Sequence, residues 1–143
     1  MMGNQGTDNE YLISEIKKTL EFHKSGLSDT RVDVSRLSDD SKDIGSLFNE
    51  LLNVYQENLN HIDKSVNNLQ KGDFETEGFN LPGKYATISD GIETLRSSML
   101  MIEKDISRFS SAFDNGNLNL HVDSAKYKGG FADIIEMMDK GIE

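Results

Sequence analysis

One segment of the chain repeats apolar residues with a strict helical period. From Lys84 to Asn115 there are 32 residues with a single glycine, Gly91, and no proline. Apolar side chains recur there in alternating steps of three and four residues, the heptad spacing of a coiled-coil seam. The positions are Tyr85, Ile88, Ile92, Leu95, Met99, Ile102, Ile106, Phe109 and Phe113. So thin a stripe cannot fill a globular core, and it predicts a long helix that packs against partner helices.

A second helix of this kind is predicted earlier in the chain. Residues 46–71 contain neither glycine nor proline, and their seam begins just before them. It consists of Ile44, Phe48, Leu51, Tyr55, Asn58, Ile62, Val66 and Leu69. Two consecutive steps of four, from Asn58 to Val66, form a stutter that joins two heptad registers. The predicted fold class is therefore all-α.

The composition suits a seam better than a self-contained enzyme. Only 36% of the 143 residues are hydrophobic, and the formal net charge is −10. Such an acidic chain is a poor ligand for nucleic acid or an anionic membrane. The absence of cysteine excludes disulfides and thiolate metal sites. With no apolar run of membrane-spanning length, we expect a cytoplasmic segment without direct membrane contact, and no cofactor, metal or catalytic residue.

The chain contains a threefold internal repeat. It aligns on Gly26, Gly72 and Gly116, which are spaced 46 and 44 residues apart. The helical seam before these glycines includes Ile16, Leu20, Ile62, Val66, Leu69, Ile106, Phe109 and Phe113. New helices begin near Ile44, Tyr85 and Phe131, and the last continues through Ile134 and Met138. The repeating unit is thus helix, glycine, connector, helix.

Each connector begins at a glycine that suits a left-handed helix C-cap and then carries spaced apolar residues. These residues are Leu27, Val32 and Val34 in the first connector, Phe74, Phe79 and Leu81 in the second, and Leu118, Leu120 and Val122 in the third. An extended connector of this length spans the length of a short helix. The two helices of a unit are therefore predicted to run parallel.

This pattern resembles the HAMP domain, and three units in tandem resemble the poly-HAMP arrays of bacterial and archaeal receptors. The resembling segments are Lys24-Ser25-Gly26-Leu27, Gln70-Lys71-Gly72-Asp73-Phe74 and Asp114-Asn115-Gly116-Asn117-Leu118. The family's acidic-x-Gly signature is similar to Asp43-Ile44-Gly45 and is missing from the second unit. The stretch from Tyr127 to Ile134 resembles the one that precedes the signalling helix of methyl-accepting chemotaxis proteins.

The resemblance implies a parallel homodimer with four helices per unit. The units would be residues 11–57, 58–101 (divergent) and 102–143, after a polar segment of residues 1–10. They would form a non-catalytic relay between a sensor and an output domain of one chemoreceptor-type transducer. The last helix reaches Glu143 without a breaker, so we expect the output domain to follow it. The alternatives are the same module in a sensor histidine kinase or cyclase, or a structural coiled-coil spacer.

Other chemistry has weaker support in the sequence. His61 lacks the acidic neighbour and downstream proline of a kinase phospho-acceptor. His23 takes a seam position, where a polar core residue and a pH-sensitive switch are both open. The segment Asp114–Asn119 lacks the ligand alternation of a calcium loop.

Overall fold

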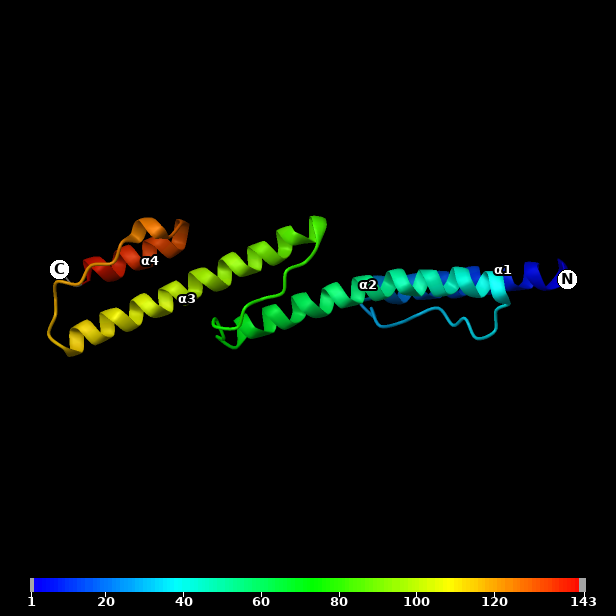
Figure 1. Cartoon of the computed structure of the whole chain (residues 1–143), viewed down its shortest axis with the longest axis horizontal. Coiled ribbons are helices and arrows are strands. Elements are labelled where there is room, and N and C mark those ends of the chain that lie inside the picture. The colour runs from blue at the N-terminus through cyan, green and yellow to red at the C-terminus, as the bar shows by residue number, and fades with distance from the viewer. Residues whose placement is uncertain (1, 142–143) are drawn as a thin grey trace. The chain divides into compact units, whose positions relative to one another are not determined.

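The computed structural model describes the backbone of residues 2–141 and the side chains of residues 6–141. Within this range the chain is helical, with no strand, which confirms the all-α prediction (Figure 1). The elements are α1 (Met2–Lys24), α2 (Asp39–Gln70), the short 3₁₀ helix η1 (Gly83–Tyr85), α3 (Ala86–Asp114), η2 (Ser124–Lys126) and α4 (Gly129–Lys140).

Helices α1 and α2 begin earlier than their apolar seams. Helix α1 includes the polar residues before Tyr11, and α2 begins at Asp39, ahead of the seam residue Ile44. Asp39 and Asp40 lie in the first turn of α2, where acidic side chains interact favourably with the helix dipole. The preceding residue, Ser38, donates its backbone N–H to the carboxylate of Asp8 at 2.9 Å. Polar contacts therefore set this helix start, and apolar periodicity does not detect them.

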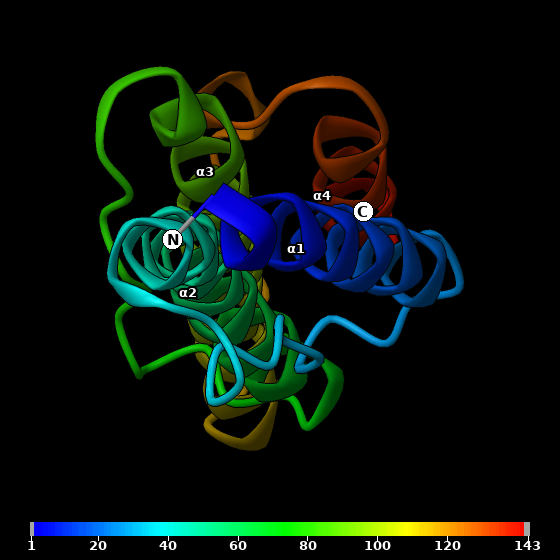
Figure 2. The same cartoon turned by 90° about the vertical axis from the view of Figure 1, so that its right-hand side faces the viewer.

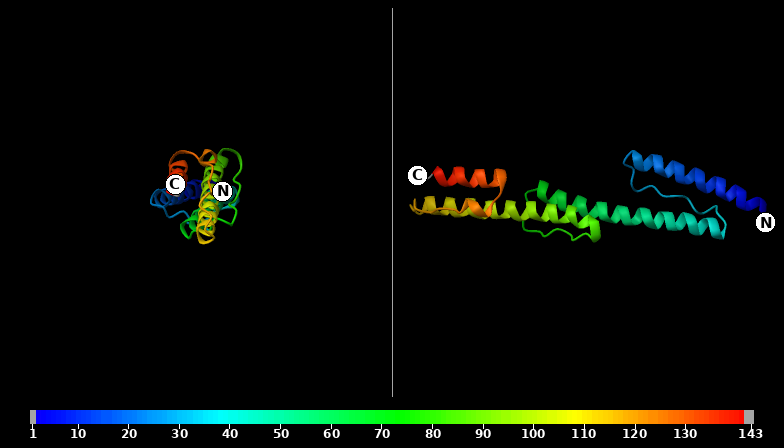
Figure 3. Two further views of the ribbon diagram at one scale, coloured as in Figure 1. Left: turned by 90° about the vertical axis from the view of Figure 1, so that its left-hand side faces the viewer. Right: turned by 90° about the horizontal axis from the view of Figure 1, so that it is seen from above.

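The chain divides into two compact units, Met1–His61 and Ile62–Glu143. In the first unit, the connector after α1 returns along the helix, so that α2 begins beside α1 and runs in the same direction (Figures 2 and 3). The second unit contains the end of α2, then α3 and α4, and its two connectors return in the same way (Figures 1 and 3). The structure thus shows two compact units, and the division of the sequence into three repeats remains a prediction.

Each compact unit has one small apolar core built around a connector. In the first unit, Leu12 of α1 packs with Val32 and Leu37 of the connector, and Phe48 of α2 lies against them. In the second unit, the buried cluster consists of Ile102, Phe109, Val122, Tyr127 and Ile135. In each core, side chains of a connector thus pack with those of the helix that precedes it and the helix that follows.

The three helix ends at the repeat glycines have the same geometry. Gly26, Gly72 and Gly116 have φ values of 86°, 77° and 74°. At Gly26, the glycine N–H donates to the carbonyl of His23 at 3.0 Å, and the next N–H donates to the carbonyl of Phe22 at 2.9 Å. The same pair of bonds recurs at Gly72 and Gly116, and it defines the Schellman motif. The predicted left-handed C-caps are therefore confirmed.

Gly116→Ala tests whether the left-handed cap stabilises the fold. A Cβ at Gly116 would meet no atom within 4 Å, so the cost comes from backbone strain alone. We expect the free energy of unfolding to fall by about 1 kcal/mol, because L-residues disfavour positive φ. Gly91→Ala, within α3 and equally open, is the control and should add about 0.5–1 kcal/mol. Urea denaturation followed by circular dichroism measures both, and shifts of the same sign would contradict this reading of the cap.

Candidate functional site

A side chain of the following helix holds the middle of the first connector. The amide of Asn49 on α2 accepts a hydrogen bond from the N–H of Val32 at 2.8 Å and donates one to the Val32 carbonyl at 2.9 Å. Val32 is 3% exposed. Both polar backbone groups of a buried residue are thereby satisfied, which is the condition for burying an extended connector. We call this contact the connector latch.

The N–H half of the latch recurs at the other two connectors, where a carboxylate accepts the bond. Val122 stands six residues after Gly116, as Val32 stands after Gly26, and its N–H donates to the carboxylate of Asp139 at 3.1 Å. The ring Nδ1 of His121 lies 3.2 Å from the same carboxylate. In the second connector the corresponding residue is Gly78. Its N–H donates to Glu93, whose pKa is lowered chiefly by the hydrogen bond from Arg96 and further by this N–H.

The second connector has an additional clasp. The guanidinium of Arg96 donates to the backbone carbonyl of Phe74 and forms an ion pair with Glu93. The Arg96 side chain is 11% exposed. Arg96, whose side chain is mostly buried, therefore links Phe74 at the start of the connector to Glu93, which binds the middle of the connector. Charged contacts thus stabilise the second connector, which has few apolar contacts.

One buried position beneath each connector varies in size among the repeats. It is Gly45 in the first repeat, Ser89 in the second and Ile135 in the third, and all are buried. A Cβ on Gly45 would lie 2.7 Å from Cγ1 of Val34, so the connector approaches α2 too closely for a side chain. The Gly45 of the acidic-x-Gly segment is therefore explained by packing, whereas Asp43 is exposed. In the third repeat, Ile135 is 0% exposed and fills the same place.

The third connector is tied to α3 by a buried carboxylate. Asp105 is 2% exposed, and it accepts a hydrogen bond from the Tyr127 hydroxyl. Nζ of Lys126 lies 2.9 Å from the carboxylate, and Arg108 lies 3.4 Å from it. Burial acts to raise the pKa of Asp105, but the hydrogen bonds from Tyr127 and Lys126 and the two positive charges outweigh it and lower the pKa. The pKa of Tyr127 is raised by burial and by Asp105.

The helices also carry apolar residues on faces that nothing in the described chain covers. In α2, Ile44, Leu47, Leu51 and Val54 are 54%, 64%, 53% and 52% exposed. Their steps of three, four and three residues place them in one row. In α3, the exposed row includes Ile88, Leu95, Ile106 and Phe113. Apolar surface of this extent is typical of an interaction face.

The residues predicted for connectors and core fall into three groups. Buried ones are Val32, Leu81, Val122, Ile102 and Phe109. Partly buried ones are Val34, Phe74, Ile16, Phe48, Ile62, Leu69, Ile92, Met99, Phe131 and Met138. Exposed ones are Leu27, Leu118, Leu20, Ile44, Leu51, Val66, Tyr85, Ile88, Leu95, Ile106, Phe113 and Ile134. The connector residues Val32, Val34, Phe74, Leu81 and Val122 are thus at least partly buried, whereas Leu27 and Leu118 are exposed, and the exposed helix residues remain a predicted interface.

Sequence reasoning missed the polar contacts of the connectors. Asn49 and Asp139 both stand 23 residues after their repeat glycine, a recurrence that the sequence contains. The periodicity search considered apolar residues only, so it did not detect Asn49 and Asp139. Asp105 gave no signal, because its partners lie about 20 residues away on a connector. His23, expected at a seam, is half-buried, and its Nε2 lies 3.0 Å from the carbonyl oxygen of Thr30.

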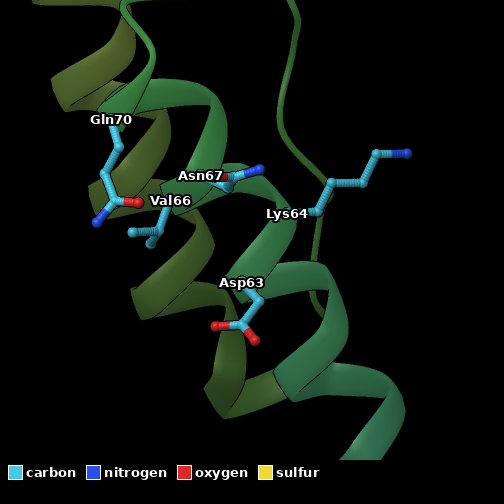
Figure 4. A pocket seen from close by; sticks show the side chains of 5 residues that line it. All are labelled: Asp63, Lys64, Val66, Asn67 and Gln70. Atoms are coloured by element: carbon cyan, nitrogen blue, oxygen red, sulfur yellow. The ribbon is translucent and has the colours of Figure 1, made fainter.

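The described residues offer no enclosed site for a small ligand. The depression in Figure 4 is lined by residues of one helix: Asp63, Lys64, Val66, Asn67 and Gln70. The Lys64 side chain points away from the others. No cluster of three or more histidine and acidic side chains in the described range could hold a metal ion. Within that range, no helix is both long and apolar enough to cross a membrane.

Comparison with known proteins adds no identification. No family model matches the chain, and no curated protein sequence is significantly similar to it.

Asn49→Ala removes both hydrogen bonds of the first latch. We expect the free energy of unfolding to fall by about 1–2 kcal/mol, because the N–H and carbonyl of Val32 lose their partner while Val32 is buried. Asn53→Ala, one turn further along α2, is the matched control. Asn53 is exposed and accepts a bond from Arg31, so its loss should cost less than about 0.5 kcal/mol. Equal losses in denaturant titrations would refute the latch.

Asp105→Asn tests the buried carboxylate through its pH dependence. The pKa of Asp105 is lower in the folded chain than in the unfolded chain, so its stabilisation is present above the unfolded pKa and is lost as the pH falls below about 4. We expect the wild type to be more stable than Asp105→Asn at neutral pH by about 1–2 kcal/mol, with the gap closing in acid. Asp133→Asn, exposed on α4, controls for net charge. A stability difference between the wild type and Asp105→Asn that stays constant with pH would show that the charge of Asp105 does not stabilise the fold.

Proposed function

We propose that this chain is a non-catalytic signal-relay module of the HAMP type, which works as a parallel homodimer between a sensor and an output domain. The observation that carries the proposal is the repeated connector. Three times, a helix ends in a left-handed glycine cap, and a latched connector follows. A spacer that only sets a distance needs no such element, because a plain heptad helix does the same.

The exposed apolar rows support the dimer. On α3, Phe109 is buried in the core of its unit, whereas Ile106 is 46% exposed. In the first unit, Leu12 of α1 is buried in the core, whereas Leu51 of α2 is 53% exposed. Each helix thus has one apolar face for its connector and a second for another helix. A second copy supplies matching rows, since parallel helices of identical sequence place equal residues at equal heights.

The weak apolar packing of the second repeat supports a role in signal relay. Leu81 is the buried apolar residue of the second connector, and it belongs to neither of the two buried clusters. The corresponding position beneath that connector is Ser89, whose hydroxyl accepts a hydrogen bond from the Leu81 N–H at 3.1 Å. A repeat held by polar contacts rather than by a close-packed core has packing alternatives of similar free energy. We infer that the second repeat is where a shift passes along the array.

Helix α2 supplies the mechanical link. It is one continuous helix from Asp39 to Gln70, and it belongs to both compact units. The stutter from Asn58 to Val66 lies in this helix, where the two heptad registers meet. Rotation or displacement of the helix in one unit must therefore be accommodated in the next.

A fusion experiment tests the proposal. The chain is placed between a dimeric receptor sensor of known ligand and a cyclase that is active only as a dimer. We expect ligand to change the cyclase rate several-fold. Ile106→Asp should abolish this change, because a carboxylate in the exposed row opposes closure of the dimer. Ser107→Asp, with the same added charge on an exposed neighbour, should retain it. If the cyclase rate does not respond to the ligand while the fusion protein stays dimeric, the chain is a structural spacer and not a relay.

A further inference from the structure

The face of α3 that binds the second connector is a row of polar side chains. It consists of Ser89, Glu93 and Arg96, spaced four and three residues apart. Ser89 accepts the N–H of Leu81 at 3.1 Å. One turn further along α3, Glu93 accepts the N–H of Gly78. Arg96, in the following turn, donates to the carbonyl of Phe74. The connector is thus bound to α3 at three successive levels, each time by a polar side chain.

The same positions in the other two repeats are mainly non-polar. They are Gly45, Asn49 and Leu52 on α2, and, among the described residues, Ile135 and Asp139 on α4. Gly45 and Ile135 are buried, and Leu52 is partly buried. Within the described range, only the middle position of these two repeats is polar. The second repeat therefore differs in having a fully polar binding face for its connector.

The second connector also has little apolar attachment. Of its three large apolar residues, Leu81 is buried, Phe74 is partly buried and Phe79 is 48% exposed. The first connector, in contrast, buries Val32 and Leu37 in one apolar cluster. Apolar burial stabilises in proportion to the area buried, whereas a hydrogen bond that can be exchanged for one with water contributes little net stability. We therefore expect the second connector to be held less firmly than the first.

Release of the second connector leaves no charge unpaired on α3. Arg96 and Glu93 belong to the same helix, and Nε of Arg96 lies 2.9 Å from a carboxylate oxygen of Glu93. Their ion pair therefore persists when Phe74 and Gly78 move away. The Glu93 side chain is 41% exposed, so water can replace the N–H group that it binds. An attachment of this kind can open at low free energy while the helices stay folded.

We propose that the second connector is a releasable strap, which detaches from α3 as one unit while α2 and α3 stay helical. The inference rests on the proposed relay and names its moving part. A Cβ at Gly78 would lie 3.4 Å from Oγ of Ser65 on α2 and 3.6 Å from a carboxylate oxygen of Glu93 on α3, so the bound strap contacts both helices. Once released, it no longer ties them, and they can shift against each other. Arg96 is the positioning residue, since it binds Phe74 and orients the Glu93 carboxylate.

Hydrogen exchange of the full chain tests the strap without any fusion partner. After correction for intrinsic rates, we expect the N–H groups of Gly78 and Leu81 to show equal protection, because they are released together. Both should exchange at least about tenfold faster than the N–H of Val32, whose connector has apolar anchors. Protection of Gly78 and Leu81 equal to that of Val32 would show that no strap is released.

A pair of charge-removing substitutions tests the role of Arg96. In Arg96→Ala, the same two N–H groups should exchange about tenfold faster than in the wild type, because the strap loses one bond and the orientation of another. The N–H of Val32 should keep its wild-type rate. Lys104→Ala, which removes a positive charge from an exposed site on α3, is the matched control and should change neither rate. Equal effects of the two substitutions would remove the positioning role of Arg96.

A reversible disulfide tests whether release is needed for relay. The ideal Cβ of residue 78 lies 4.0 Å from Cβ of Ser65, a separation that suits a disulfide. The chain has no cysteine of its own. In the sensor–cyclase fusion, with the fusion partners free of cysteine, we expect oxidised Ser65→Cys/Gly78→Cys to lose the ligand response several-fold. Dithiothreitol should restore the response, and Gly78→Cys alone should respond equally under both conditions.

The outcomes separate the two proposals. An oxidised double variant that responds as strongly as its reduced form would overturn the strap while leaving the relay intact. A wild-type fusion without any ligand response would overturn the proposed function itself, and the strap would then stand or fall by the exchange rates of Gly78 and Leu81.

Discussion

The architecture depends on burying an extended backbone between helices. A connector in that position has N–H and carbonyl groups that a neighbouring helix cannot satisfy through its own backbone, since helical backbone groups are already paired. Asn49 supplies partners for both groups of Val32, and the carboxylates of Glu93 and Asp139 accept the N–H groups of Gly78 and Val122. With the backbone satisfied, residues such as Val32 and Val122 can fill the cores. The left-handed caps are the complementary requirement, because they turn the chain back at the end of each helix.

The three connectors are held by different chemistry. The first uses a neutral amide latch and a close backbone approach at Gly45, and the third uses a carboxylate latch and a fully buried Ile135. The third repeat further replaces an aliphatic anchor, Leu37 in the first, with Tyr127 bonded to a buried Asp105. Apolar packing and charged hydrogen bonds are thus exchanged at equivalent places.

Apolar periodicity predicted the helices, because the side chains of one helix face recur at regular intervals in the sequence. The glycine caps were equally predictable, since few residues other than glycine adopt positive φ. The latches were beyond that reasoning. In the sequence alone, a polar helix residue such as Asn49 cannot be told from one on the solvated surface. Only the structure shows that it hydrogen-bonds to the connector. Nor can one sequence assign a helical face to its own connector or to another chain, which is why Ile102 and Ile106 were predicted on one seam and are buried and exposed, respectively.

Sharing α2 between the two compact units has a thermodynamic consequence. The helix cannot unravel at its middle without breaking backbone hydrogen bonds on both sides of the boundary between the units, so opening one unit carries a free-energy cost in the other. A destabilising substitution in the first unit is expected to loosen the amides of Ile62 to Gln70 as well, even though no side chain there has changed.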